Sequence, residues 1–228
     1  SGRLLRDRSE AGKRLAAELA ELRGSDCVVL ALPRGGVPIG FEIASELRAP
    51  LGLIMVRKIG APGQPELALG AVADGGEPVT VFNSNVLSIL GLTPADLEGQ
   101  VLEQLKEIER RRRLYGGHLT LPPIEGRSVI LVDDGIATGA TTRVAIQAVR
   151  RRRPACIVLA VPVASTDTLV RLEDEVDRVV CLEKPQDLEA ISLHYRHFPQ
   201  VPDEEVIEFL ERAKARANAA TDPGVSGR

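Results

Sequence analysis

Residues 129–142, VILVDDGIATGATT, combine residue types that could bind a phosphate, a diol and a metal ion. The apolar run 129–132 is typical of a buried strand, and Asp133 and Asp134 stand at its C-terminal end, where open α/β sheets collect their ligands. A turn of small residues and hydroxyls follows before a helix, and it contains Ala137, Thr138, Gly139, Ala140 and Thr141. A helix start favours phosphate through its free N–H groups, and carboxylates suit sugar hydroxyls or hydrated Mg²⁺.

Other phosphate-binding patterns fit this segment less well. A P-loop is excluded because no Gly-Lys-Ser/Thr is present, and no G-x-G-x-x-G opens a helix after a strand. A phospho-acceptor receiver domain also has acidic residues at strand ends, but it does not need the Thr-Gly-Ala-Thr turn. The simplest alternative is a strand–turn–helix corner in which Asp133 and Asp134 are solvated or cap the helix.

The order of residues in this segment resembles the PRPP-binding motif of type I phosphoribosyltransferases. The shared features are an apolar run, two acidic residues, a short variable stretch and Thr-Gly-x-Thr. The resemblance implies that the 5-phosphate of PRPP lies in the turn 137–141 and that its ribose diol binds Asp133 and Asp134. It also implies Mg²⁺ as cofactor, held by the same two carboxylates through water.

A second glycine turn, Pro33-Arg34-Gly35-Gly36, lies between another apolar run and a helix. Glycines permit positive φ and close approach of an anion to the backbone, and an arginine offers a planar fork suited to phosphate. The turn resembles the pyrophosphate-binding loop of the same transferases, most closely the Arg-Gly-Gly form of the 6-oxopurine enzymes. The alternative is an ordinary glycine turn with a surface arginine.

The pair Arg57-Lys58 precedes a segment rich in glycine and proline, and we expect 57–78 to form a mobile lid with part of a hairpin. Lids in this family bring cations to the departing pyrophosphate, but no Lys or Arg lies between Lys58 and Pro78. Pyrophosphate would then depend on Mg²⁺, Arg34, Gly35, Gly36, Arg57 and Lys58. The resemblance implies Asp133, Asp134, Arg34 and Lys58 as the catalytic residues.

Aromatic residues gather in the segment 192–198, SLHYRHF, of a chain that has no Trp, two Tyr and four Phe. A flat nucleobase is commonly held by an aromatic ring and by hydrogen bonds at its edges. His194, Tyr195 and Phe198 are therefore candidates for a base-binding hood, which these transferases have near one end of the chain. The alternative is a loop whose aromatic side chains seal the edge of the sheet.

Alternating strand and helix patterns predict an α/β fold, a doubly wound, mainly parallel sheet flanked by helices. Strands are expected at 27–32, 51–56, 79–82, 128–132, 157–163 and 178–182, and helices at 9–23, 37–47, 94–113, from the phosphate turn to Arg153, 166–175 and from Asp203. We expect one domain over 1–220, with its core at 25–185, a hood at 183–202 with the C-terminal helix, and a disordered tail at 221–228. The arginine runs 110–113 and 150–153 end two helices, where cations are favoured, and are expected to be solvated, with RNA contact as the alternative.

Composition limits the classes of function. The 228 residues are 44% hydrophobic with a net charge of −3, which gives no general reason for nucleic-acid binding. No apolar run approaches the ~18 residues of a membrane span, and no secretory signal is evident. Three scattered cysteines, Cys27, Cys156 and Cys181, predict reduced thiols and a cytoplasmic protein.

The favoured function is transfer of phosphoribose from PRPP to a nucleobase or another nitrogen acceptor. A PRPP-sensing regulator is the first alternative, and a hydrolase-like or ligand-binding use of the same turn is the second. Hypoxanthine–guanine transferases carry an aspartate where this chain has Ala137. Because Ala137 cannot make that contact with a purine, the acceptor is left open, as is the oligomeric state, a homodimer included.

Overall fold

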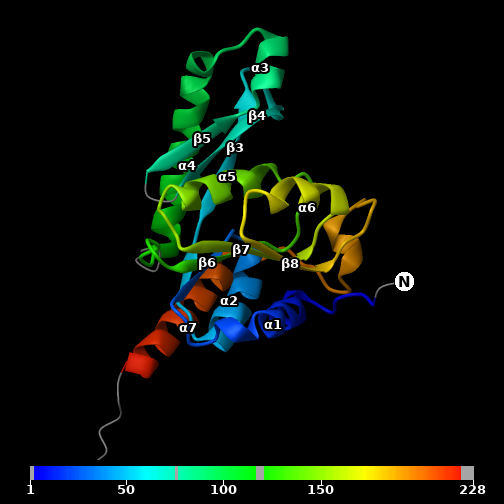
Figure 1. Cartoon of the computed structure of the whole chain (residues 1–228). Coiled ribbons are helices and arrows are strands. Elements are labelled where there is room, and N and C mark those ends of the chain that lie inside the picture. The colour runs from blue at the N-terminus through cyan, green and yellow to red at the C-terminus, as the bar shows by residue number, and fades with distance from the viewer. Residues whose placement is uncertain (1–2, 75–76, 117–120, 222–228) are drawn as a thin grey trace, which may run out of the picture.

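The computed structural model describes residues 3–74, 77–116 and 121–221. Its main body is a five-stranded sheet, every strand of which is parallel to its neighbours (Figure 1). The strand order is β2 (Leu51–Leu53), β1 (Cys27–Ala31), β6 (Ser128–Val132), β7 (Cys156–Val163) and β8 (Arg178–Glu183). The predicted doubly wound, mainly parallel sheet flanked by helices is confirmed.

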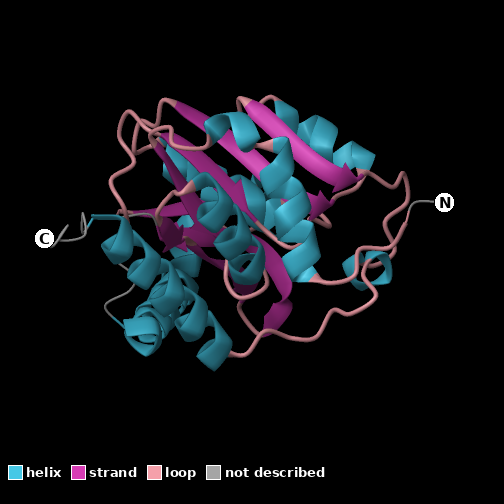
Figure 2. Ribbon diagram, turned by 90° about the horizontal axis from the view of Figure 1, so that it is seen from below, coloured by secondary structure: helices cyan, strands magenta, loops and turns pink. Residues whose placement is uncertain are grey.

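Helices cover both faces of this sheet, which explains why the inner strands β1 and β6 are buried almost throughout rather than alternately (Figure 2). Side chains of β1 such as Val28 and Leu30 pack with α5 and α6, whereas Val29 packs with α1 and α2 on the other face. The covering helices are α1 (Arg8–Glu18), α2 (Gly36–Leu47), α5 (Ala140–Arg150), α6 (Thr166–Glu173) and α7 (Asp203–Thr221), the last of which packs on α2.

The segment 57–78, predicted to be a mobile lid with part of a hairpin, is a hairpin over most of its described length, and its role as a lid stays a prediction. A three-stranded antiparallel sheet contains β3 (Met55–Ala61), β4 (Gln64–Asp74) and β5 (Pro78–Phe82). It projects from the main body beside α4 (Glu98–Tyr115) (Figure 1). The predicted strand 51–56 is accordingly divided between the two sheets.

The glycines that indicated a loop have specific places in this second sheet. Gly63 turns the chain between β3 and β4 with a φ of +75°. A Cβ at Gly60 would lie 2.5 Å from the carbonyl oxygen of Pro65, and one at Gly70 would lie 2.3 Å from that of Val81. Close approach of neighbouring backbone, rather than mobility, therefore accounts for glycine at Gly60 and Gly70.

A short helix, α3 (Ser84–Leu90), was not predicted. The side chain of Asn83 accepts a hydrogen bond from the backbone N–H of Val86, and Gly91 ends the helix with a φ of +66°. A 3-10 turn at Pro94–Leu97 then leads into α4. The caps at both ends were visible in the sequence, but the helix is too short to show a clear periodicity.

The arginine run 110–113 is not uniformly solvated, which corrects the prediction for the end of α4. Arg112 pairs with the buried carboxylate of Asp74, whereas Arg113 is an exposed helix-end cation. The hydroxyl of Tyr115 donates a 2.8 Å hydrogen bond to Asp203, which joins α4 to α7, and burial raises the pKa of Tyr115 to about 12.

Two further predictions concern membrane spans and the end of the chain. Across the described ranges, no helix combines the length and hydrophobicity that crossing a bilayer requires. The predicted disordered tail falls almost entirely on 222–228, which lie outside the described residues, while Thr221 is the last residue of α7.

Candidate active site

The two glycine-containing turns predicted to bind PRPP meet at the C-terminal ends of the neighbouring strands β1 and β6. The backbone N–H of Leu32 donates to the carbonyl oxygen of Val132 at 2.9 Å. A Cβ at Gly36 would lie 2.7 Å from the same oxygen, and one at Gly35 would lie 1.9 Å from Oδ2 of Asp134. The parallel register of the two strands therefore sets one turn directly against the other.

Gly35 is needed for space and not for a left-handed conformation. Its φ is −61°, which any residue adopts, so the positive φ that glycine permits is not used at this position. The Pro33–Arg34 peptide that precedes it is cis. The side chain of Arg34 is exposed and makes no hydrogen bond or ion pair with any other residue that the structure describes.

The acidic pair is held rigidly at the end of β6. Oδ1 of Asp133 accepts a 2.8 Å hydrogen bond from the backbone N–H of Asp134. Burial raises the pKa of the Asp133 carboxyl well above its ordinary value, and the neighbouring charge of Asp134 adds to the effect. A carboxylate pair in such surroundings favours a ligand that brings positive charge or hydrogen-bond donors.

Arg8, at the start of α1, approaches the acidic pair from the other end of the chain. Its Nη2 and Nε lie 3.1 and 3.2 Å from Oδ2 of Asp134, and its guanidinium lies 3.8 Å above the ring of Phe198. Only 8% of the residue is exposed. Arg8 was not predicted as a site residue, because no local pattern in the sequence relates it to a carboxylate 126 positions away.

The turn between β6 and α5, predicted to bind phosphate, contains several backbone N–H groups without a partner among the described residues. Gly139 has a φ of +81° and begins α5. Within the described part of the chain, the N–H groups of Ala137, Thr138, Gly139 and Thr141 donate to no other residue. The hydroxyl of Thr168, in α6, donates a 2.8 Å hydrogen bond to the carbonyl oxygen of Ala137 and so holds the turn in place.

A cavity of about 690 Å³ is lined by the β3–β4 hairpin, by α4 and by Thr141 at the start of α5. Arg57 and Lys58 of β3 line one side of the cavity and Thr141 lies on another. Nε of Arg57 donates to Oε1 of Gln104 at 3.1 Å. Arg34 does not face this cavity but shares a smaller one with Arg57. The structure thus brings the predicted cations and the phosphate turn to one edge of the main sheet.

Comparison with known proteins agrees with this geometry. The model of the phosphoribosyl transferase domain matches residues 4–196. The chain belongs to this family. The crystal structure of TT1426 from Thermus thermophilus shares 40% sequence identity and superposes with a TM-score of 0.78, covering 92% of this chain and 99% of that one.

Two proteins of Mycobacterium tuberculosis, from strains CDC 1551 and H37Rv, each bear the name "Putative phosphoribosyl transferase". Each is 43% identical over 227 residues, which is 97% of this chain and 51% of the relative's length. The chain therefore spans about half the length of these curated relatives, and the match supports the family rather than a substrate.

In this phosphoribosyl transferase domain, the segment 191–198, part of the predicted hood, packs against the N-terminal segment. The backbone N–H of Leu5 donates to the carbonyl oxygen of His194 at 3.0 Å, and Leu5 pairs with Tyr195 as an isolated parallel bridge. Ile191, in a 3-10 turn at Ile191–His194, covers Gly135, where a Cβ would lie 2.4 Å from it. The N-terminal segment and 191–198 thus lie together over the end of β6.

Tyr195 is placed differently from the predicted stacking ring. It is 5% exposed, and its ring packs with Leu5 and Val163 and lies 4.5 Å from that of Phe198. Its hydroxyl donates a 2.8 Å hydrogen bond to the carbonyl oxygen of Asp134, and burial raises its pKa. This placement favours the sealing alternative for Tyr195, while base binding by His194 and Phe198 stays a prediction.

Replacing Tyr195 with phenylalanine should lower stability without disturbing the ring cluster. Loss of one buried hydrogen bond costs about 1 kcal/mol, which for a domain of this size lowers Tm by about 2–4 °C. Differential scanning calorimetry of both proteins measures the effect. An unchanged Tm would show that the hydroxyl does not anchor the hood to Asp134.

Proposed function

We propose that the protein transfers the 5-phosphoribosyl group of PRPP to a nitrogen acceptor, most simply a nucleobase. The bond between C1 of the ribose and the pyrophosphate oxygen breaks, a bond from C1 to nitrogen forms, and pyrophosphate leaves. One observation carries the proposal, namely the contact of Gly35 with the carboxylate of Asp134. It supports the proposal because the turn that we assign to pyrophosphate lies directly against the acidic pair that we assign to ribose.

The proposed roles follow the charge that develops in this reaction. The N–H groups of the turn 137–141 bind the 5-phosphate, and Asp133 and Asp134 accept hydrogen bonds from the ribose hydroxyls. Arg34, Gly35, Gly36, Arg57 and Lys58 face the pyrophosphate, on which negative charge grows while positive charge grows on the ribose ring. Catalysis then depends on positioning and on preorganised charge.

The donor set fits the Mg²⁺ that the family resemblance implies. Asp133 and Asp134 supply hard oxygen ligands, and among the described residues no group of three or more His, Cys, Asp or Glu side chains could hold a metal alone. Magnesium is commonly bound by one or two carboxylates together with substrate phosphates. When bound, it would neutralise part of the pyrophosphate charge, and the two aspartates would hold it through water.

The acceptor side of the proposed site is formed by the hood. His194 and Phe198 are the candidates for contact with a nucleobase, and Ala137 offers it no carboxylate. All three cysteines are free thiols, which supports a reducing compartment such as the cytoplasm. We therefore propose a cytoplasmic enzyme of nucleotide metabolism.

A PRPP sensor without transferase activity is the alternative. It is favoured by the hairpin of β3 and β4, whose segment 59–77 contains no Lys or Arg to enclose the pyrophosphate. A sensor would bind PRPP through the same turns but would not release pyrophosphate with any acceptor.

Pyrophosphate release from PRPP and Mg²⁺ tests the proposal against this alternative. A panel of purines, pyrimidines and small amines is supplied as acceptors, and PRPP binding is followed in parallel by thermal shift. Release that depends on one acceptor class is the expected result. Stabilisation by PRPP without release for any acceptor would contradict transfer and support the sensor.

A further inference from the structure

A cavity of about 210 Å³ beside the pyrophosphate turn is lined by three arginines from three different elements. Arg34 comes from the turn after β1, Arg57 from β3 and Arg111 from α4. Val56 and Ile108 are among its apolar lining, and no acidic side chain is among the described residues that line it. The sequence analysis expected Arg111 to be solvated, yet its side chain is only 26% exposed.

The partners of these arginines leave much of their charge uncompensated. Nε of Arg111 lies 3.1 Å from Oε1 of Glu107, but the same carboxylate also accepts two hydrogen bonds from Arg110. Arg57 is hydrogen-bonded to a neutral amide, and the side chain of Arg34 has no ion pair within the described residues. Three guanidinium groups around one cavity repel one another, and an anion bound there would relieve that repulsion.

We propose that Arg111 of α4 is a further ligand of the pyrophosphate group of PRPP, beside Arg34 and Arg57, with which it lines this cavity. The inference rests on the proposed function, which it deepens by adding a pyrophosphate ligand. Guanidinium groups suit phosphate because they donate two parallel hydrogen bonds. At about 30 Å³ for each water, the cavity holds about seven, so a group of several heavy atoms fits.

The position of the cavity agrees with this assignment. It shares Val56 and Arg57 with the larger cavity that contains Thr141 of the phosphate turn. Arg57 therefore lines both cavities, the smaller of which contains Arg111 and the larger Thr141. A ligand with phosphate groups at both ends, as in PRPP, matches such a pair of adjoining cavities.

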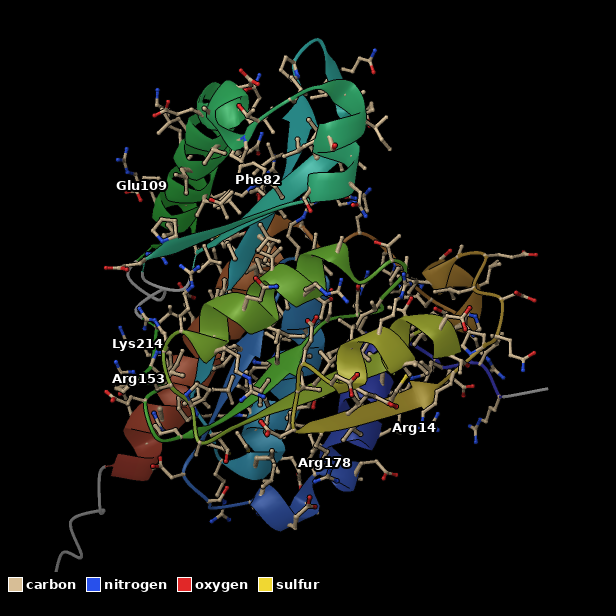
Figure 3. The ribbon with its side chains drawn as sticks, turned by 45° about the horizontal axis from the view of Figure 1, so that its top comes forward. Arg14, Phe82, Glu109, Arg153, Arg178 and Lys214 are labelled. Carbon is tan, nitrogen blue, oxygen red and sulfur yellow. The ribbon has the colours of Figure 1, made fainter. Side chains whose placement is uncertain are left out.

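Isothermal titration of the protein with inorganic pyrophosphate and Mg²⁺ tests Arg111 directly. Arg111→Gln should weaken pyrophosphate binding by about 10-fold, since a charge-assisted contact is lost. Arg113→Gln is the matched control, because it makes the same charge change on the same helix. The Arg113 side chain is 79% exposed and pairs with Glu109 on the outer side of α4 (Figure 3). The control should bind pyrophosphate like the unaltered protein.

A second variant separates anion binding from a purely structural role of Arg111. Glu107→Gln removes the carboxylate that shares Arg111, so it should strengthen pyrophosphate binding several-fold, and Glu109→Gln should not. Equal pyrophosphate affinity in Arg111→Gln, Glu107→Gln and the unaltered protein would overturn the inference. If Arg111→Gln fails to fold, the pyrophosphate affinity of Glu107→Gln tests the inference alone, and an unchanged affinity would overturn it.

The inference and the proposed function fail separately. If Arg111→Gln weakens pyrophosphate binding but no acceptor supports turnover, transfer is refuted. Arg111 is then still a pyrophosphate ligand, as it would be in a PRPP sensor. If the enzyme turns over PRPP but Arg111→Gln leaves pyrophosphate affinity unchanged, Arg111 is not a pyrophosphate ligand and the transferase function still stands.

Discussion

Replacing Asp133 with asparagine is expected to weaken PRPP binding in the presence of Mg²⁺ by about 100-fold while leaving the fold intact. In the proposed complex the carboxylate would accept hydrogen bonds from the ribose hydroxyls and attract the metal, and contacts to a charged group are worth up to ~3 kcal/mol. Asparagine keeps an oxygen that can accept the 2.8 Å hydrogen bond from the N–H of Asp134. Asp133 is preferred to Asp134 because it is not the ion-pair partner of Arg8.

Stability gives this prediction a second, independent readout. Burial and the charge of Asp134 raise the pKa of Asp133, so its ionised form is unfavourable in the ligand-free fold. The neutral variant should therefore have a Tm at least as high as that of the unaltered protein. Asp26→Asn makes the same charge change at an exposed side chain and should leave PRPP affinity unchanged. Equal PRPP affinity in the two variants would remove Asp133 from the ribose site.

The parts of the site that are formed by residues close together in the sequence could be predicted from the sequence. The strand at 128–132 has the predicted bounds, and both glycine turns lie at strand ends as expected. Each of these features depends on a short run in which burial, turn chemistry and helix start agree. Parallel strands then bring their C-terminal ends to one edge, so the meeting of Gly35 with Asp134 follows from the fold class.

The second sheet could not be predicted in the same way. Glycine and proline in 57–78 indicate a loop when only local conformation is considered. Gly60 and Gly70 instead lie where the backbone of the next strand approaches, which is a relation between paired strands rather than a local conformation. A glycine required for space and a glycine required for flexibility look alike in a sequence.

Arginines brought from distant elements were missed for a related reason. Arg8 reaches Asp134 only because the N-terminal segment lies against the hood, and Arg111 reaches a cavity only because α4 packs on β3. A charge run at a helix end is solvated by default, and only tertiary packing distinguishes Arg111 from Arg113. The positions of Arg111 and Arg113 in α4 did not reveal which of the two lines the cavity.

Replacing Gly35 with alanine is expected to reduce kcat/KM for PRPP by about 100-fold. The added Cβ would lie 1.9 Å from Oδ2 of Asp134, so either the turn or the carboxylate must move by about 1 Å or more before the contact is tolerable. A displacement of that size in a catalytic arrangement costs about two orders of magnitude in rate. Alanine adopts the φ of −61° found here without strain, so the effect isolates the close contact from backbone conformation.

Gly99→Ala provides the matched control, because nothing lies within 4 Å of a Cβ at that position in α4. Alanine favours a helix over glycine by up to about 1 kcal/mol, so this variant should be fully active and slightly more stable. Steady-state kinetics and calorimetry of both variants separate site geometry from folding. Full activity in Gly35→Ala would mean that the turn can withdraw from Asp134 without consequence. The contact between the two turns would then be a feature of packing, and the proposed transfer would lose the observation that carries it.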